Sequence, residues 1–67
     1  MERVKLDLLR VDGNAYSLLG AFGAKAREQG WDEPAIEGVQ AEAMSGDYKH
    51  LVQTLMDHTD LPNEQIV

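Results

Sequence analysis

The 67-residue sequence contains no cysteine, which excludes disulfide bonds and thiolate metal clusters as sources of stability. Its unbroken apolar runs are only two or three residues long, too short to cross a membrane. Residues 1–5 alternate charged and apolar side chains and lack the apolar core of a signal peptide. We therefore expect a cytoplasmic protein with no membrane association.

Positive charge is also scarce, since 6 Lys and Arg stand against 12 Asp and Glu, for a net charge of −6. Residues 1–30 hold five basic and four acidic residues, whereas residues 31–67 hold one basic and eight acidic residues. Non-specific nucleic-acid binding depends on Lys and Arg that neutralise phosphates. We therefore expect no direct binding to nucleic acid.

The length and a hydrophobic share of 43% predict one small globular domain over residues 1–67. Residues 3–11 alternate apolar and polar side chains, which predicts a β-strand. Helical spacing of apolar residues predicts helices over 15–29, 33–45 and 48–60. The expected fold is mostly α, with one N-terminal β-strand followed by a compact three-helix unit.

Local signals mark where these helices begin and end. Asn14, Asp32 and Asp47 are the expected N-caps. Gly30 is expected to end the first helix in a left-handed conformation, with Trp31 folding back on the last turn. The predicted core consists of Leu6, Leu8, Leu18, Leu19, Phe22, Trp31, Ile36, Val39, Leu51, Val52 and Leu55.

The predicted strand needs a partner, because a single strand leaves its backbone N–H and C=O groups unpaired. One candidate is the tail Ile66–Val67. The other is the same strand of a second copy, which would give a homodimer through residues 3–11.

Several short motifs are shared with a group of small phage-borne and bacterial proteins. The sequence resembles their DGNAF–LLG–GW–SGDY–LL–TL layout over residues 12–58, with Tyr16 in place of phenylalanine. The matching residues are Asp12-Gly13-Asn14-Ala15-Tyr16, Leu19-Gly20, Phe22, Gly30-Trp31, Ser45-Gly46-Asp47-Tyr48, Leu51 and Thr54-Leu55. The resemblance implies a phage or prophage accessory protein and carries over no catalytic residue.

A second resemblance is to ubiquitin-associated domains, which are compact three-helix units. There a glycine and a large apolar residue join the first two helices, as Gly30-Trp31 does here, and a polar turn like Gly46-Asp47 precedes the third. The leading strand and the acidic second helix depart from that pattern.

Catalytic and metal-binding patterns are weak. The carboxylates fall at caps or on polar helix faces, where solvation keeps them from acting as an acid–base pair. His50 and Asp57 share a helix face but lie about 10 Å apart along the axis, too far to bind one metal ion. We predict no catalytic residue, no metal site and no cofactor.

Two surfaces are candidates for binding a partner. On the first helix, the side away from the core carries small residues and one charge, which predicts that the strand or a partner covers Ala21 and Ala24. This face comprises Ser17, Gly20, Ala21, Ala24 and Glu28. An acidic face, either solubilising or a decoy for nucleic-acid phosphates, comprises Glu33, Glu37, Glu42, Asp57 and Asp60.

Two further pairs of residues bear on binding. Gly20 and Gly23 lower helix propensity, so a neighbouring element or a partner is expected to approach them closely. Trp31 and Tyr48 are expected to seal the core, with an exposed binding anchor as the alternative.

The function predicted from the sequence is a non-enzymatic protein-interaction module, a phage or prophage accessory protein that binds a host or phage protein. One alternative is an acidic nucleic-acid mimic that blocks a DNA-handling or defence enzyme. The other is a small-ligand binder or an enzyme subunit.

Overall fold

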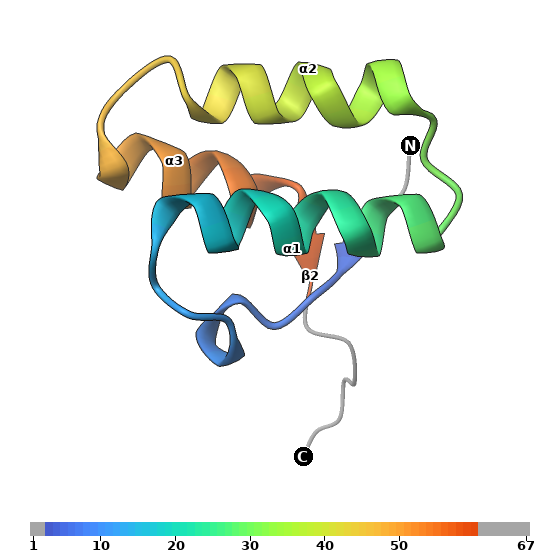
Figure 1. Cartoon of the computed structure of the whole chain (residues 1–67), viewed down its shortest axis with the longest axis horizontal. Helices are drawn as coiled ribbons and strands as arrows, with labels where there is room; N and C mark the ends of the chain where they lie inside the picture. The colour runs from blue at the N-terminus through green and yellow to red at the C-terminus, as the bar shows by residue number, and fades with distance from the viewer. Residues whose placement is uncertain (1–2, 61–67) are drawn as a thin grey trace.

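The computed structural model describes residues 3–60, and Figure 1 shows three helices with the N-terminal segment running along one side of them. The elements in chain order are β1 (Val4–Lys5), the 3₁₀ helix η1 (Leu8–Arg10), α1 (Ala15–Glu28), α2 (Glu33–Ala43), α3 (Tyr48–Asp57) and β2 (Thr59–Asp60). A mostly helical chain with one short strand before a three-helix unit is confirmed.

Each helix begins at the predicted N-cap. The Asn14 side chain accepts hydrogen bonds from the N–H groups of Tyr16 and Ser17. Asp32 accepts from Ala35, and Asp47 accepts from His50 at 2.9 Å. These side chains satisfy N–H groups that have no partner within the helix, and they explain why all three starts were predictable.

The first helix ends as expected at a glycine. Gly30 adopts a φ of 98°, a conformation that costs glycine little because it has no Cβ. The Trp31 N–H donates to the Ala26 carbonyl at 3.0 Å, so the chain folds back over the last turn. The Trp31 ring then packs edge-on against Phe22, with ring centroids 5.5 Å apart.

The prediction of a strand over 3–11 is wrong beyond its first residues. Only Val4–Lys5 is a strand, and Leu8–Arg10 forms a 3₁₀ turn. The cause is local, because the Asp7 carboxylate accepts a hydrogen bond from the Leu9 N–H at 3.0 Å and starts the turn. The break in alternation at Leu9 was the sequence signal for it.

The strand pairs with a segment that neither sequence-based candidate included. β1 lies parallel to β2, with Val4 opposite Thr59 and Lys5 opposite Asp60. The third helix was predicted to continue to residue 60, but it ends at Asp57. At the C-cap the His58 N–H donates to the Leu55 carbonyl at 3.0 Å and its ring Nδ1 lies 2.9 Å from the Thr54 carbonyl, after which the chain extends. The other candidate, Ile66–Val67, lies outside the described residues.

The first two helices are also slightly shorter than predicted, since α1 ends at residue 28 instead of 29 and α2 at residue 43 instead of 45. At the end of α2 the Ser45 N–H bonds to the Glu42 carbonyl, which tightens the chain into a turn.

The core lies where the three helices and β1 meet. Seven of the predicted core residues are buried: Leu6, Leu18, Leu19, Phe22, Ile36, Leu51 and Leu55. The other four, Leu8, Trp31, Val39 and Val52, are partly buried and pack against them. The sequence-based list omitted Val4, Ala26 and Ala43, which are completely buried.

Candidate functional site

Five large hydrophobic side chains are exposed in the described part of the chain. They are Leu9 (92% exposed), Tyr16 (80%), Met44 (56%), Tyr48 (52%) and Met56 (52%). Tyr48 was expected to seal the core, but only the alternative of an exposed position agrees with the structure. Single exposed apolar residues are ordinary, so the arrangement of these five decides their meaning.

Three of the five border a hollow of about 630 Å³ between the N-terminal segment and α3, which we call the η1–α3 groove. One wall is a stripe on α3 formed by Tyr48, Val52 and Met56, which share a helix face because they are four residues apart. The full lining is Leu6, Asp7, Leu8, Leu9, Val11, Gly13, Leu18, Tyr48, Val52, Leu55, Met56, Thr59 and Asp60.

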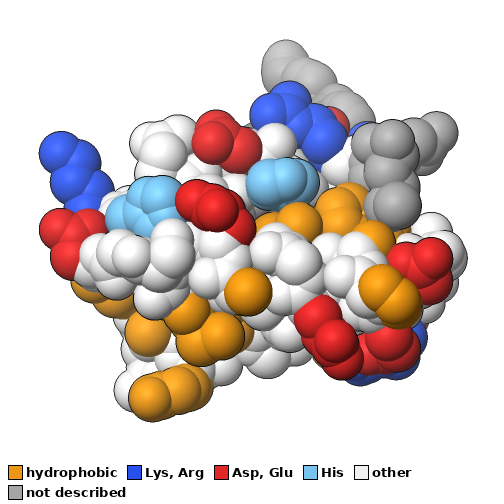
Figure 2. All heavy atoms as spheres, turned by 90° about the horizontal axis from the view of Figure 1, so that it is seen from above, with side chains coloured by type: hydrophobic (Ala, Val, Ile, Leu, Met, Phe, Trp, Pro, Cys, Tyr) orange, Lys and Arg blue, Asp and Glu red, His pale blue; other side chains and the backbone are white. Residues whose placement is uncertain are grey.

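A smaller hollow of about 340 Å³ adjoins this groove at Tyr48, which lines both. Its other lining residues are Ala15, Tyr16, Leu19, Met44, Gly46, Asp47 and Leu51. Figure 2 shows hydrophobic side chains gathered at the end of the molecule where α1 begins and α2 ends, at its lower left. All five exposed side chains therefore line two adjoining hollows, and we call these five the apolar surface.

Two hydrogen bonds hold the groove in shape. The Tyr48 hydroxyl donates to the Gly13 carbonyl and ties the loop before α1 to the start of α3. The Asp7 carboxylate, which caps η1, places Leu9 on the outer side of that turn. The groove is thus formed by backbone segments that polar contacts fix in position.

In the described part of the chain, the charged residues that line the two hollows are all acidic: Asp7, Asp47 and Asp60. Asp7 pairs with Arg10 at 3.4 Å, and Asp60 pairs with Arg3 at 3.5 Å. Neither arginine lines a hollow. The apolar surface is therefore bordered by carboxylates.

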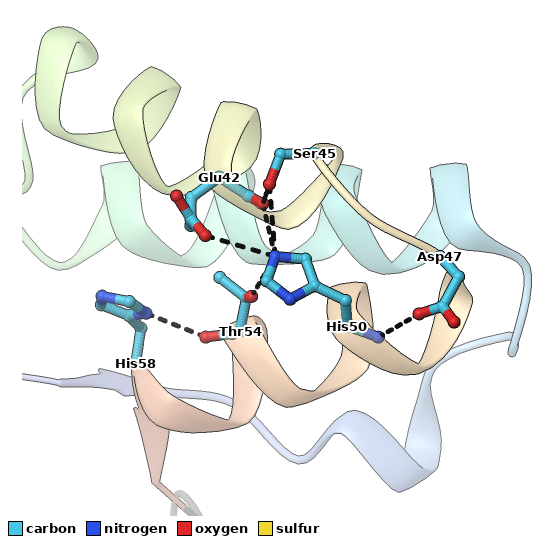
Figure 3. A network of polar contacts seen from close by, with 6 residues as sticks. All are labelled: Glu42, Ser45, Asp47, His50, Thr54 and His58. Atoms are coloured by element: carbon cyan, nitrogen blue, oxygen red, sulfur yellow. Dashed lines mark hydrogen bonds and ion pairs between the residues drawn. The ribbon is translucent and has the colours of Figure 1, made fainter.

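A polar cluster on the other side of α3 brings His50 together with Ser45 and Glu42 (Figure 3). The Nε2 atom of His50 lies 2.9 Å from the Glu42 carbonyl, 3.2 Å from a Glu42 carboxylate oxygen and 3.3 Å from the Ser45 hydroxyl. Thr54, the buried polar side chain of α3, approaches the same nitrogen at 3.4 Å.

This cluster has the residue types of a nucleophilic site but not its geometry. The Ser45 hydroxyl donates to the Glu42 carbonyl at 2.7 Å, so its proton does not point at His50. An acid that orients a catalytic histidine contacts the ring nitrogen opposite the nucleophile, whereas Glu42 and Ser45 share Nε2. The arrangement instead caps the carboxyl end of α2.

The predicted small-residue face of α1 is only partly exposed. Gly20, Ala24 and Glu28 are exposed, while Ser17 and Ala21 are partly buried. No described segment covers Ala24, so the strand does not lie there, and a partner over this face stays a prediction.

The two helical glycines of α1 differ. A Cβ on Gly23 would lie 2.8 Å from the Gln40 side chain, so α2 approaches this position closely as expected. A Cβ on Gly20 would meet nothing within 4 Å, so no described element approaches Gly20.

The five residues of the predicted acidic face do not form one cluster of unpaired carboxylates. Glu33 accepts two hydrogen bonds from Arg27, one of them 3.0 Å long, and these bonds, with the charge of Arg27, hold the pKa of Glu33 below its ordinary value. Glu42 contacts His50, Asp57 accepts from Gln53 at 3.2 Å, and Asp60 pairs with Arg3. Glu37 is exposed on α2. In Figure 2 the acidic side chains are spread in separate groups.

Within residues 3–60, no group of three or more His, Cys, Asp or Glu is placed to hold a metal ion. Over the same residues, no helix combines the length and hydropathy needed to cross a membrane.

Of the apolar surface, reasoning from the sequence named only Tyr48, as the alternative of an exposed binding anchor, and missed the other four residues, although two weak signals pointed to them. Leu9 breaks the alternation of the predicted strand, and Met56 lies on the flank of the apolar stripe of α3. Tyr16 and Tyr48 follow N-caps, where a side chain can face either the core or solvent. Their exposure depends on packing between elements.

Comparison with protein families, curated proteins and solved structures gives no match for this chain. The functional argument therefore depends on the arrangement of its own residues.

Proposed function

We propose that this protein is a non-enzymatic interaction module that binds a protein partner through the apolar surface. One observation carries the proposal: all five exposed large hydrophobic side chains of the described residues line two adjoining hollows that share Tyr48. Contiguous apolar surface on a small protein is typical of an interface, since its burial by a partner is favourable. Tyrosine and methionine are also enriched at such interfaces.

The alternatives have less support. In Figure 2 the acidic side chains lie in separate groups, whereas the phosphates of a nucleic acid form a continuous row. The Ser45–His50 contact lacks the geometry of an activated nucleophile. The resemblance of residues 12–58 to short phage-borne and bacterial proteins supports an accessory role toward a host or phage protein in the cytoplasm.

The test is affinity capture from a lysate of the source cells, at low and at high salt, with two matched variants. Met56→Glu places a charge on the apolar surface at a half-exposed site. Ala24→Glu places the same charge at an exposed site on the predicted small-residue face of α1. We expect a partner retained at high salt by the wild type and by Ala24→Glu but lost with Met56→Glu.

The opposite pattern, loss with Ala24→Glu alone, would move the interface to α1 and overturn the proposal. Capture only at low salt, unchanged by either variant, would favour an acidic mimic, because salt screens interactions between exposed charges. Circular dichroism of both variants establishes that each is folded.

A further inference from the structure

The shape of the η1–α3 groove limits what it can accept. The α3 stripe from Tyr48 to Met56 spans nine residues, or about 12 Å along the helix axis. The opposite wall is formed by the apolar side chains of Leu8, Leu9 and Val11. A groove of this length beside a helix matches two to three turns of a second helix, whose apolar residues at i, i+4 and i+7 would enter it.

The charges around the groove limit the partner further. Carboxylates border both ends of the α3 stripe, with Asp47 beside Tyr48 at its start and Asp60 lining the groove beyond Met56. Asp7 adds a third on the opposite wall, and among residues 3–60 no lysine or arginine lines either hollow. The chain as a whole carries a net charge of −6, so a positively charged segment is also attracted from a distance.

The ion pairs at Asp7 and Asp60 do not prevent a positively charged partner from binding there. Arg10 and Arg3 are exposed, at 86% and 52% of their side-chain surface. Asp60 is also exposed, at 45%, so its pair contributes little to stability, whereas Asp7 is 22% exposed. Because both arginines reach into solvent, a partner's lysine or arginine can share or replace them at these carboxylates.

We propose that the η1–α3 groove binds a basic amphipathic helix of a partner protein, with aliphatic side chains against Tyr48, Val52 and Met56. The lysine or arginine residues that flank its apolar stripe lie near Asp7, Asp47 and Asp60. This inference rests on the proposed function and specifies the chemistry of the partner. It is tested with synthetic probes, so its result is independent of capture from a lysate.

The probes are two helical peptides of about 14 residues with the same stripe of leucines, one with lysine and the other with glutamate at the polar positions. Binding is measured by calorimetry and by methyl NMR shifts at Leu8, Val52 and Leu55. We expect the lysine peptide to bind with shifts at these methyl groups, and the glutamate peptide to bind at least tenfold more weakly.

Three variants separate the apolar contribution to peptide affinity from the electrostatic contribution. The double variant Leu9→Ser, Met56→Ser removes exposed apolar contacts and should lower the affinity for the lysine peptide at least tenfold. A triple variant removes the three lining charges: Asp7→Asn, Asp47→Asn and Asp60→Asn. Asn retains the capping ability of Asp, so the fold is kept, and the affinity for the lysine peptide should fall about fivefold. The matched control removes three charges elsewhere (Glu28→Gln, Asp32→Asn and Glu37→Gln) and should change affinity less than twofold.

Each other outcome overturns the inference. Equal loss in both triple variants would show that only the net charge matters. Equal binding of the two peptides would contradict a basic partner while leaving the apolar surface as an interface. If neither peptide binds, the groove does not accept a helix, and capture with Met56→Glu still tests the proposed function separately.

Discussion

The side-chain amide of Gln29 pairs with the backbone of Lys5 as a strand would. Its Oε1 accepts from the Lys5 N–H at 2.8 Å, and its Nε2 donates to the Lys5 carbonyl at 3.0 Å. On the other edge of β1, the Val4 N–H donates to the His58 carbonyl and the Leu6 N–H to the Asp60 carbonyl. β1 is therefore paired on both edges within one chain, which leaves Lys5 no free backbone group for pairing with a second copy.

Replacing Gln29 with methionine, which has a similar length but no amide, should expose this edge. We expect a loss of about 1–2 kcal/mol of unfolding free energy, because two hydrogen bonds are removed. Hydrogen exchange at the Lys5 amide should become faster, and light scattering over a concentration series should show more self-association than in the wild type. Unchanged exchange at Lys5 would contradict the role of Gln29.

Removal of the N-caps should destabilise the fold at two separate points. Asn14→Ala and Asp47→Ala each remove the acceptor of N–H groups in the first helical turn. We expect each to cost about 1 kcal/mol. In a domain of this size that corresponds to a melting temperature lower by several degrees. Asn14→Asp and Asp47→Asn, which retain an acceptor, should stay close to the wild type in the same thermal melts.

The glycines of α1 should respond differently to alanine. Gly20→Ala adds a Cβ in open space, so the better helix propensity should stabilise the fold by up to about 1 kcal/mol. Gly23→Ala forces Gln40 away from its 3.0 Å hydrogen bond to the Leu19 carbonyl, which offsets that gain. Denaturant unfolding of both single variants measures the difference. The double variant Gly23→Ala, Gln40→Ala, in which the displaced side chain is removed, tests whether Gln40 is its cause. Equal stabilisation by the two single changes would contradict it.

Gly46 should be intolerant of a side chain because of His50. A Cβ there would lie 2.8 Å from Cγ and 2.9 Å from Cβ of His50, and these atoms cannot swing away as the tip of a flexible side chain can. We expect Gly46→Ala to destabilise the fold by about 1–3 kcal/mol. In a His50→Ala background the same change should cost much less, and thermal melts of the four proteins measure this coupling.

Acid should weaken the link between α1 and α2. The hydrogen bonds and charge of Arg27 lower the pKa of Glu33, so the ionised pair adds stability that is fully present above the ordinary pKa of a glutamate. This contribution is lost as the pH falls through the lowered pKa. Glu33→Gln should lack this part of the pH dependence. An NMR titration should find the pKa of Glu33 raised toward its ordinary value in Arg27→Met. An unchanged pKa in that variant would contradict the pairing.

The sequence by itself determined where the helices begin, where α1 ends and most of the core. These features depend on interactions within three or four residues, such as the Asn14 carboxamide with the N–H groups of Tyr16 and Ser17, or the positive φ of Gly30. The apolar spacing of α1 and α3 then sets which faces are buried, since that spacing follows from 3.6 residues per turn.

Only the tertiary structure decided what β1 pairs with and which hydrophobic residues stay exposed. Val4 and Thr59 are far apart in the chain, and two-residue strands carry too little pattern to identify each other. The exposure of Leu9, Tyr48 and Met56 likewise depends on how η1 lies against α3. The Asp7 cap and the Tyr48–Gly13 hydrogen bond set that placement. Tyr48 and Gly13 come close to each other only once the helices have packed.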